Sequence, residues 1–291
     1  MRIDRILEKK MTFSFEVFPP KNDQPLEPLR ETLDQLSKFK PDFISVTYGA
    51  GGTNKGRNNE VCMEILDRDI NLMSHFTCIG NSKEDVFNRV TKFENMGGEN
   101  LLALRGDLPD GWNCTGGEYK HADSLIEALT EQFPNMCLAG ACYPEKHIEA
   151  KTFDSDIAHM RSKQNNGAKF FVTQLCYDTE AFERFLIRCE KAGIDAPIIV
   201  GVMPVLYKNG VLRMTTSNGC SIPAELADII GKYGEKPDEF KKAGKEYTKE
   251  LIYKYMSLGI DGLHVYSLNK YKDLAEIIND SGIRGSFDLK K

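Results

Sequence analysis

The sequence predicts a (β/α)8 barrel, a closed ring of eight parallel strands with helices outside it. Short apolar runs alternate with helical patterns along the chain, and eight such units can be counted. A glycine precedes an apolar run at Gly97, Gly167, Gly193 and Gly259, as expected where a helix C-cap leads into a buried strand. Alternating units with parallel connections form an open doubly wound sheet or a closed barrel, and eight units of roughly 30 to 40 residues favour the barrel. We therefore expect residues 1–291 to form one domain.

The first half of the chain is predicted to contain four strands and three helices. Apolar runs predict the strands at 13–18, 43–47, 72–77 and 101–104. The first ends at Pro19, and the fourth lacks the alternation of a half-exposed strand, so we expect it to be buried on both faces. Helices are expected at 26–39, through 61–65 and at 82–93. Leu29, Leu33 and Leu36 share one face of the first helix, and Ser82 begins the third as its N-cap.

The second half repeats the pattern. Strands are predicted at 136–142, 170–173, 198–202 and 263–266. Helices are expected at 124–133, 153–165, 178–189, 223–233, 237–258 and 274–278. Ser124 and Glu127 have the spacing of a capping box, and Asp178 is the N-cap of its helix. Residues 203–220 are interpreted as a long connection.

Composition indicates a globular protein with a small-molecule partner. The chain has 291 residues, of which 41% are hydrophobic and 28% charged. A net charge of −5 and a pI near 5.7 argue against a nucleic-acid surface. Residues 1–11 lack the apolar core of a signal peptide and no run is long enough to span a membrane, so we expect a cytoplasmic protein. The eight cysteines contain no Cys-x-x-Cys and are best explained as small core residues.

Polar side chains stand at or just after the ends of seven predicted strands. They are Glu16, Thr47, His75, Arg105, Asp107, Tyr143, Gln174 and Asn269. In a barrel all of them would face one mouth, where ligands and catalytic groups are found. Each alone could have a structural role: Glu16 on a half-exposed strand, His75 as a core histidine and Gln174 as a polar group inside the barrel. Because Glu16 lies among Phe15 and Val17 in the sequence, desolvation is expected to raise its pKa and suit it to act as a general acid.

Other chemistries have less support in the sequence. The five histidines contain no His-x-x-x-His pair, so no metal site is expected. Neither Gly-x-Ser-x-Gly nor Gly-x-Gly-x-x-Gly occurs in a suitable place, which argues against a serine hydrolase and a Rossmann domain. The glycine-rich stretch 49–52 could hold a phosphate, although a tight turn is the commoner reason for such glycines.

The motifs at the strand ends resemble those of the methylenetetrahydrofolate reductase family. The most specific are Ser-Phe-Glu-Val-Phe-Pro-Pro at 14–20 and Leu-Arg-Gly-Asp-Leu-Pro at 104–109. Further matching stretches are 46–50, 75–78, 143–147, 173–174 and 264–269, in the order of the family. The resemblance implies a catalytic barrel of the bacterial type with FAD at the mouth, FMN remaining an alternative. It also implies a ping-pong hydride relay from NADH to flavin and then to methylenetetrahydrofolate.

The resemblance also suggests roles for individual residues. Glu16 looks like the general acid that promotes opening of the folate's five-membered ring, and Asp107 like the carboxylate near the flavin and the pterin. Gln174 is similar to the residue that contacts both substrates, and Lys270 stands where relatives carry a basic substrate contact. Positions that fall where the family binds flavin are Thr47, His75, Arg105, Gly106, Asp107, Tyr143, His147, Asp156 and Lys163.

The chain departs from the family pattern in three places. Met214 occupies the position of a substrate-loop aromatic, so no role is transferred to it. His159 and Ser162 differ from the helix that contacts the flavin phosphates in relatives, which leaves FAD against FMN open. The sequence also ends after the barrel, so regulation by adenosylmethionine is not expected.

Two other functions remain as alternatives. A barrel lyase or aldolase would use a Schiff-base lysine, but Lys169 precedes its strand and so stands at the wrong end of the barrel. The chain could instead be a flavin- or folate-binding subunit that takes electrons from a partner redox subunit. A homo-oligomer is also compatible with the resemblance.

Overall fold

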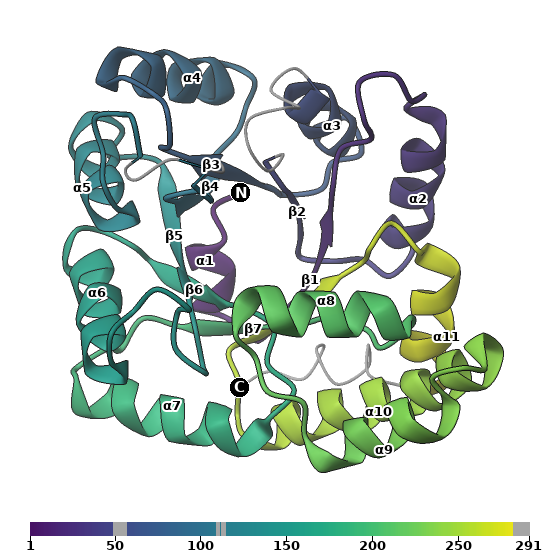
Figure 1. Ribbon diagram of the computed structural model, residues 1–291. Coiled ribbons are helices and arrows are strands. Elements are labelled where there is room, and N and C mark those ends of the chain that lie inside the picture. Colours follow the sequence, from purple (N-terminus) through teal and green to yellow (C-terminus); the bar gives the residue numbers. More distant parts are fainter. Residues whose placement is uncertain (49–56, 109–110, 112–114, 282–291) are drawn as a thin grey trace.

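The computed structural model describes residues 1–48, 57–108, 111 and 115–281, and its strands form a closed parallel barrel (Figure 1). The strands pair in chain order from β1 to β8, and β8 closes on β1. Their bounds are β1 Thr12–Val17, β2 Phe43–Val46, β3 Leu72–Thr77, β4 Asn100–Leu104, β5 Cys137–Cys142, β6 Phe170–Thr173, β7 Ile198–Val202 and β8 Gly262–Tyr266. The predicted (β/α)8 barrel is therefore confirmed.

Helices surround the strands. They are α1 Asp4–Leu7, α2 Glu27–Ser37, α3 Arg57–Leu66, α4 Lys83–Asn95, α5 Ala122–Gln132, α6 Phe153–Asn165, α7 Thr179–Lys191, α8 Lys208–Asn218, α9 Ala224–Tyr233, α10 Pro237–Ser257 and α11 Tyr271–Ser281. The predicted N-cap Ser82 is confirmed and forms a capping box with Asp85, and the predicted N-cap Asp178 accepts from the Ala181 amide. The four glycines predicted to end helices all have positive φ, which favours glycine.

Two local predictions were wrong. The predicted connection at 203–220 contains α8, which Figure 1 shows across the ring of strands. Only Val211 and Thr215 of α8 are buried, so the sequence lacks the wide apolar stripe that identifies a helix packed on the barrel wall. The second error concerns α5, which begins at Ala122 with His121 as N-cap, so Ser124 is not its cap. Ser124 instead donates to the carbonyl oxygen of His121.

The polar residues of β1 point into the barrel. Phe13, Phe15 and Val17 are fully buried in the apolar cluster that also contains residues of the outer helices. Since successive side chains of a strand point to opposite faces, Ser14 and Glu16 face the barrel interior. The alternation in this strand therefore places its apolar residues outside, against the helices, and its polar residues inside.

An apolar layer fills the lower end of the barrel, which is the end at which the strands begin. Its members are Ile3, Leu7, Phe43, Met73, Leu102, Cys137, Ala139, Phe170, Val172 and Ile199. Ile3 and Leu7 come from the N-terminal segment that carries α1, and the Ile3 amide donates to Asn100 Oδ1 at 2.7 Å. This segment covers the end of the barrel at which the strands begin, opposite the mouth formed by the C-terminal strand ends.

Among the described residues, no helix is long and apolar enough to cross a membrane. The cysteines behave as predicted: six of the seven in the described chain are buried, Cys220 is half-buried, and all seven are free. Cys114 and the glycine-rich stretch 49–52 lie outside the described residues.

Ion pairs with Asp273 hold α11 against α10. Its carboxylate oxygens lie 2.9 Å from Lys245 Nζ and 3.2 Å from Lys241 Nζ, and the side chain is only 13% exposed. Burial acts to raise the pKa of Asp273, but the two lysines outweigh it and the pKa is lowered. The contribution to stability is therefore present above the unfolded-state pKa, near 3.9, and is lost as the pH falls through the lower folded value.

We expect Asp273→Asn to lower the free energy of unfolding by about 1 kcal/mol at pH 7, because it removes the carboxylate that Lys241 and Lys245 share and leaves Lys245 with Glu276 as its remaining ion-pair partner. The difference from the parent protein should shrink as the pH falls below about 4. Urea unfolding across this pH range measures both effects. Asp228→Asn, on the exposed face of α9, is the control and should change stability by less than about 0.5 kcal/mol. A difference that does not depend on pH would contradict the ion-pair explanation.

Candidate active site

A carboxylate and two imidazoles meet inside the mouth of the barrel. Glu16 Oε2 lies 3.4 Å from His75 Nε2 and 3.8 Å from His264 Nε2. The three side chains come from β1, β3 and β8, and His264 is completely buried while 21% of the Glu16 side chain is exposed. We call Glu16, His75 and His264 the carboxylate cluster. It is the only place in the described chain where a predicted catalytic residue contacts two histidines.

The predicted direction of the Glu16 pKa was wrong. Burial does act to raise this pKa, but contact with His264 and the nearby imidazole of His75 outweigh it, and the pKa is lowered. The prediction failed because Phe15 and Val17 are neighbours in sequence only and point away from Glu16. Burial lowers the pKa of His75, although the Glu16 carboxylate acts to raise it. In the described protein Glu16 is thus a carboxylate at neutral pH.

The loop after β4 presents Arg105 and Asp107 at the mouth. Arg105 donates to both carboxylate oxygens of Glu149, and its Nε donates to the Gly106 carbonyl at 3.0 Å. Gly106 has a φ of +91°, and a Cβ there would lie 2.8 Å from Ile79 Cγ2. Only glycine fits this turn. The next residue, Asp107, is exposed beside Arg105.

The strand ends β4 and β5, together with α5 and α6, enclose a cavity of about 160 Å³. Five predicted flavin-binding residues line it: Arg105, Tyr143, His147, Asp156 and Lys163. Asp156 Oδ2 accepts from the His147 amide at 2.9 Å, and Lys163 donates to the Ala141 carbonyl at 2.8 Å. Burial lowers the pKa of Lys163. The walls therefore combine two aromatic rings in edge contact, Tyr143 and His147, with two cationic side chains.

Seven predicted site residues do not line this cavity. Glu16 and His75 belong to the carboxylate cluster and Gly106 forms the turn after β4, which leaves Thr47, Asp107, Gln174 and Lys270. Asp107 is exposed, and Thr47 makes strand-end hydrogen bonds through its backbone to Val17 and to the Asn58 side chain. Gln174 donates to Asn218 of α8 at 2.9 Å and accepts from the Leu175 amide. Lys270 is exposed just after β8. All four stand at C-terminal strand ends, so they surround the same mouth.

Sequence reasoning missed the role of some residues. His264 belongs to the matching stretch 264–269 but was assigned no role, yet it lies two residues before the end of β8 and therefore shares the inward face with Tyr266. Tyr266 donates to the Thr173 carbonyl at 2.7 Å, and the Asn269 side chain pairs with the backbone of Phe18. Asn269 thus has a structural role at the mouth. Alternation along β8 could have identified His264 as inward-facing.

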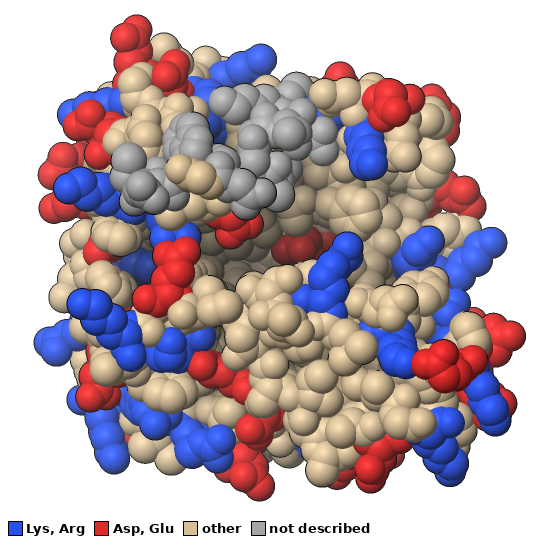
Figure 2. Space-filling model, in the orientation of Figure 1, with Lys and Arg blue, Asp and Glu red and all other residues tan. Residues whose placement is uncertain are grey.

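The cavity suits the flavin that the family resemblance implies. Outside this cavity, in the carboxylate cluster, His75 Nε2 is buried and has no hydrogen-bond partner among the described residues, so a polar group on a ligand at the mouth could satisfy it. Arg105 and Lys163 offer charge for phosphate, and the space-filling view in Figure 2 shows a hollow at the centre of this face with acidic atoms inside it. In the part of the chain that the structure describes, no group of three or more histidine, cysteine or carboxylate side chains is arranged to hold a metal ion.

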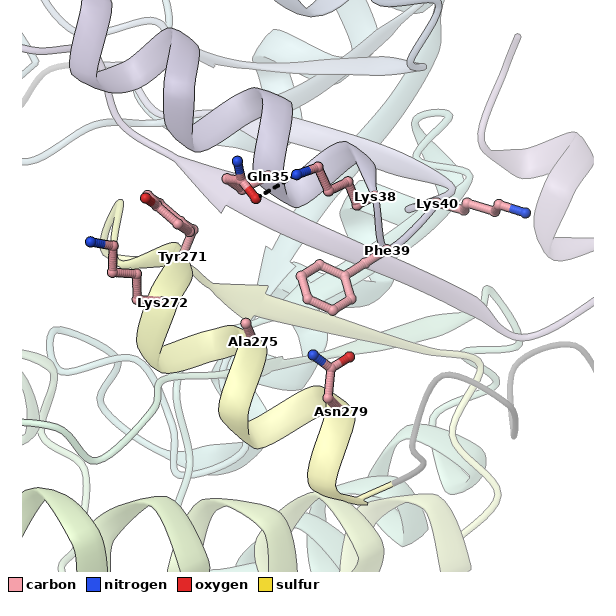
Figure 3. Close-up of a pocket in the computed structure, with 8 residues that line it drawn as sticks. All are labelled: Gln35, Lys38, Phe39, Lys40, Tyr271, Lys272, Ala275 and Asn279. Atoms are coloured by element: carbon pink, nitrogen blue, oxygen red, sulfur yellow. Dashed lines mark hydrogen bonds between the residues drawn. The ribbon is translucent and has the colours of Figure 1, made fainter.

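A larger groove lies outside the barrel, between the end of α2 and α11 (Figure 3). It measures about 760 Å³, and its walls include Lys38, Phe39 and Tyr271. None of the predicted site residues lines it. Lys169 is exposed just before β6, at the end of the barrel opposite the mouth, which argues against a Schiff-base enzyme.

Comparisons with known proteins agree with these motifs. The family model for methylenetetrahydrofolate reductase matches residues 2–282. The 5,10-methylenetetrahydrofolate reductase of Escherichia coli is 30% identical over 279 residues, which cover 96% of this chain and 93% of the relative. Methylenetetrahydrofolate reductase (NADH) 1 of Arabidopsis thaliana is 33% identical over 301 residues, which cover 97% of this chain and 50% of the relative. The chain thus spans about half the length of the plant relatives it matches.

A solved structure from Clostridium thermocellum has the same fold, with a TM-score of 0.69 and 18% identity. The match covers 98% of this chain and 99% of that protein, which is described as binding two copies of 5-methyl-5,6,7,8-tetrahydrofolic acid. At this identity the likeness supports the barrel fold alone.

Proposed function

Because this chain belongs to the methylenetetrahydrofolate reductase family, we propose that it reduces 5,10-methylenetetrahydrofolate to 5-methyltetrahydrofolate. The observation that carries the proposal is the carboxylate cluster at the bottom of the mouth, beside a cavity with cationic walls. A bound flavin supplies the hydride transfer, as the family in general requires. NADH is proposed as the electron donor, in keeping with the names of the plant relatives.

FAD is the proposed form of the flavin. The cavity continues from Arg105 and Tyr143 to His121, Asp123 and His159 between α5 and α6. Within the cavity, Lys163 is the part-buried cation on α6, so we assign it to the phosphate groups of the cofactor.

Lys163→Met keeps the length of the side chain but removes its charge. We expect the affinity for FAD and FMN to fall roughly tenfold or more, while that for riboflavin, which has no phosphate, changes little. Quenching of flavin fluorescence measures all three. Arg161→Met removes a cation from the exposed face of the same helix and should leave the affinities unchanged. Equal losses for riboflavin and FAD would show that Lys163 does not face phosphate.

Glu16 is proposed as the general acid. Reductive cleavage of the folate's five-membered ring needs a proton on the departing nitrogen, and Glu16 is the partly exposed member of the carboxylate cluster. Because its pKa is lowered in the described protein, Glu16 must take up a proton before it can act. Gln174 and Lys270 are proposed to contact the folate, and Gln174 would exchange its bond to Asn218 for one to the substrate.

The Glu16→Gln substitution separates the two half-reactions. Glutamine keeps the shape but cannot donate the proton, so flavin reoxidation by methylenetetrahydrofolate should fall roughly 100-fold or more. Bleaching of the bound flavin by NADH needs no proton from this carboxyl and should stay within about tenfold of the parent rate. Stopped-flow absorbance measures each step. Equal slowing of both steps would mean that Glu16 has a structural role, and unaffected reoxidation would mean that the proton comes from elsewhere.

Asp107 is proposed to set the electrostatic environment of the flavin. Its exposed carboxylate lies in the same loop as Arg105, and a negative charge there disfavours an anionic reduced cofactor. Asp107→Asn should therefore raise the two-electron potential of bound flavin by roughly 30 mV, which corresponds to about 1.4 kcal/mol. Potentiometric titration measures the shift, with Asp228→Asn on α9 as the distant control. An unchanged potential would place Asp107 away from the flavin.

A further inference from the structure

His264 is held inside the barrel by groups from two other strands. Its Nδ1 lies 2.7 Å from Ser14 Oγ of β1, and its Nε2 lies 3.0 Å from Ser45 Oγ of β2. The ring of Phe43 stacks on the imidazole with 5.5 Å between ring centroids. His264, Ser14, Ser45 and Phe43 are all fully buried. A histidine with this many contacts has one orientation, and both its nitrogens face a hydroxyl oxygen.

The contacts of Ser14 are compatible with a ring that carries its proton on Nδ1. The Ser14 hydroxyl donates to the Leu263 carbonyl at 3.2 Å, so its oxygen is available to accept from Nδ1–H of His264. Nε2 then faces Ser45 Oγ at 3.0 Å and Glu16 Oε2 at 3.8 Å. A neutral ring accepts from the Ser45 hydroxyl at Nε2, and a charged ring donates there. The ring can thus gain or lose a proton at Nε2 while both of its nitrogens stay hydrogen-bonded.

We propose that Glu16 and His264 hold one proton in common and that His264 passes this proton to Glu16 when the substrate needs it. The inference rests on the proposed function and assigns His264 as a positioning residue that acts through Glu16. One state is an imidazolium beside a carboxylate, and the other is a neutral imidazole beside a carboxylic acid. Both contain the same number of protons, so the buried site keeps its total charge when the proton moves.

The Nε2–H bond of His264 breaks and an Oε2–H bond forms on Glu16, after an approach of about 1 Å that brings the 3.8 Å separation to hydrogen-bond length. That O–H bond then breaks as the proton moves to the departing nitrogen of the folate. His264 remains neutral with Nδ1–H on Ser14, and the pair takes a new proton from water through the mouth.

The surroundings contain few other ionisable groups. His75 faces Glu16 from β3, and Tyr266 of β8 contacts the His264 ring edge-on at 5.8 Å between centroids. Burial lowers the pKa of His75 and raises that of Tyr266, so both are neutral near pH 7. The remaining contacts of His264 described above are serine hydroxyls and an aromatic ring. The His75 ring lies 3.4 Å from Glu16, and its lowered pKa makes it a weak competitor for the shared proton.

His264→Gln tests the proposal because glutamine can bond the serines but cannot carry the proton. Two opposite shifts are expected, because Glu16 and His264 hold the shared proton together in the parent protein, whereas Glu16 holds it alone in the variant. The pKa of the Glu16 carboxyl should rise by about one unit or more when the cationic partner is lost. The alkaline limb of the pH profile for flavin reoxidation by methylenetetrahydrofolate should instead move to lower pH by about one unit or more.

The first shift is measured without flavin or substrate, by carbon-13 NMR of the glutamate carboxyls, with the Glu16 signal assigned by its loss in Glu16→Gln. If His264→Gln fails to fold, Ser14→Ala replaces it, since it removes the acceptor of Nδ1–H and should shift both quantities in the same directions. Ser74→Ala is the matched control, because Ser74 is a buried serine of β3 that bonds Asn58 instead.

An unchanged or lowered Glu16 pKa in His264→Gln would overturn the proposal, as would equal shifts in Ser74→Ala and Ser14→Ala. A simple loss of folding would lower the rate without moving the alkaline limb. If the parent protein does not react with methylenetetrahydrofolate at all, the proposed function fails, and the NMR titration still decides whether the proton is shared.

Discussion

Closure of the eight parallel strands is the constraint on which the rest of this structure depends. Each strand must bury both faces, and in β1 the outer face takes Phe13, Phe15 and Val17 against the helices. The inner face of the same strand is then left with Ser14 and Glu16. The lower interior is filled by apolar side chains and by the segment around α1, so polar groups concentrate near the open end. The chemistry of the site follows from this division of the interior.

A carboxylate inside a barrel is costly unless other groups compensate its charge. Here the compensation comes from His75 and His264, which approach Glu16 from two other strands. The result is a carboxyl whose pKa is lowered in spite of burial, with a histidine behind it that can supply a proton. The proposed acid catalysis therefore depends on the His264 ring as much as on Glu16 itself.

The charged side chains in the walls of the cavity are also compensated by neighbouring groups. Arg105 is paired with Glu149, and Lys163 is bonded to a backbone carbonyl, so neither cation is left without a partner. Both side chains nevertheless line the cavity that extends between α5 and α6. A ligand with phosphate groups would meet cations that are already held in position, which reduces the entropy lost on binding.

Sequence alone determined the barrel, its eight strands, the helix-ending glycines and the set of polar residues at the mouth, because these follow from local periodicity and from short motifs. It did not reveal α8, whose single buried face is narrow, or the start of α5, where His121 rather than Ser124 is the N-cap. It also misjudged the pKa of Glu16, because chain neighbours such as Phe15 lie on the opposite face of the strand. Only the tertiary structure decided which groups surround that carboxyl. Residues 14, 45, 75 and 264 meet only when β8 closes on β1, and contacts across so much of the chain leave no signal in the spacing of one strand.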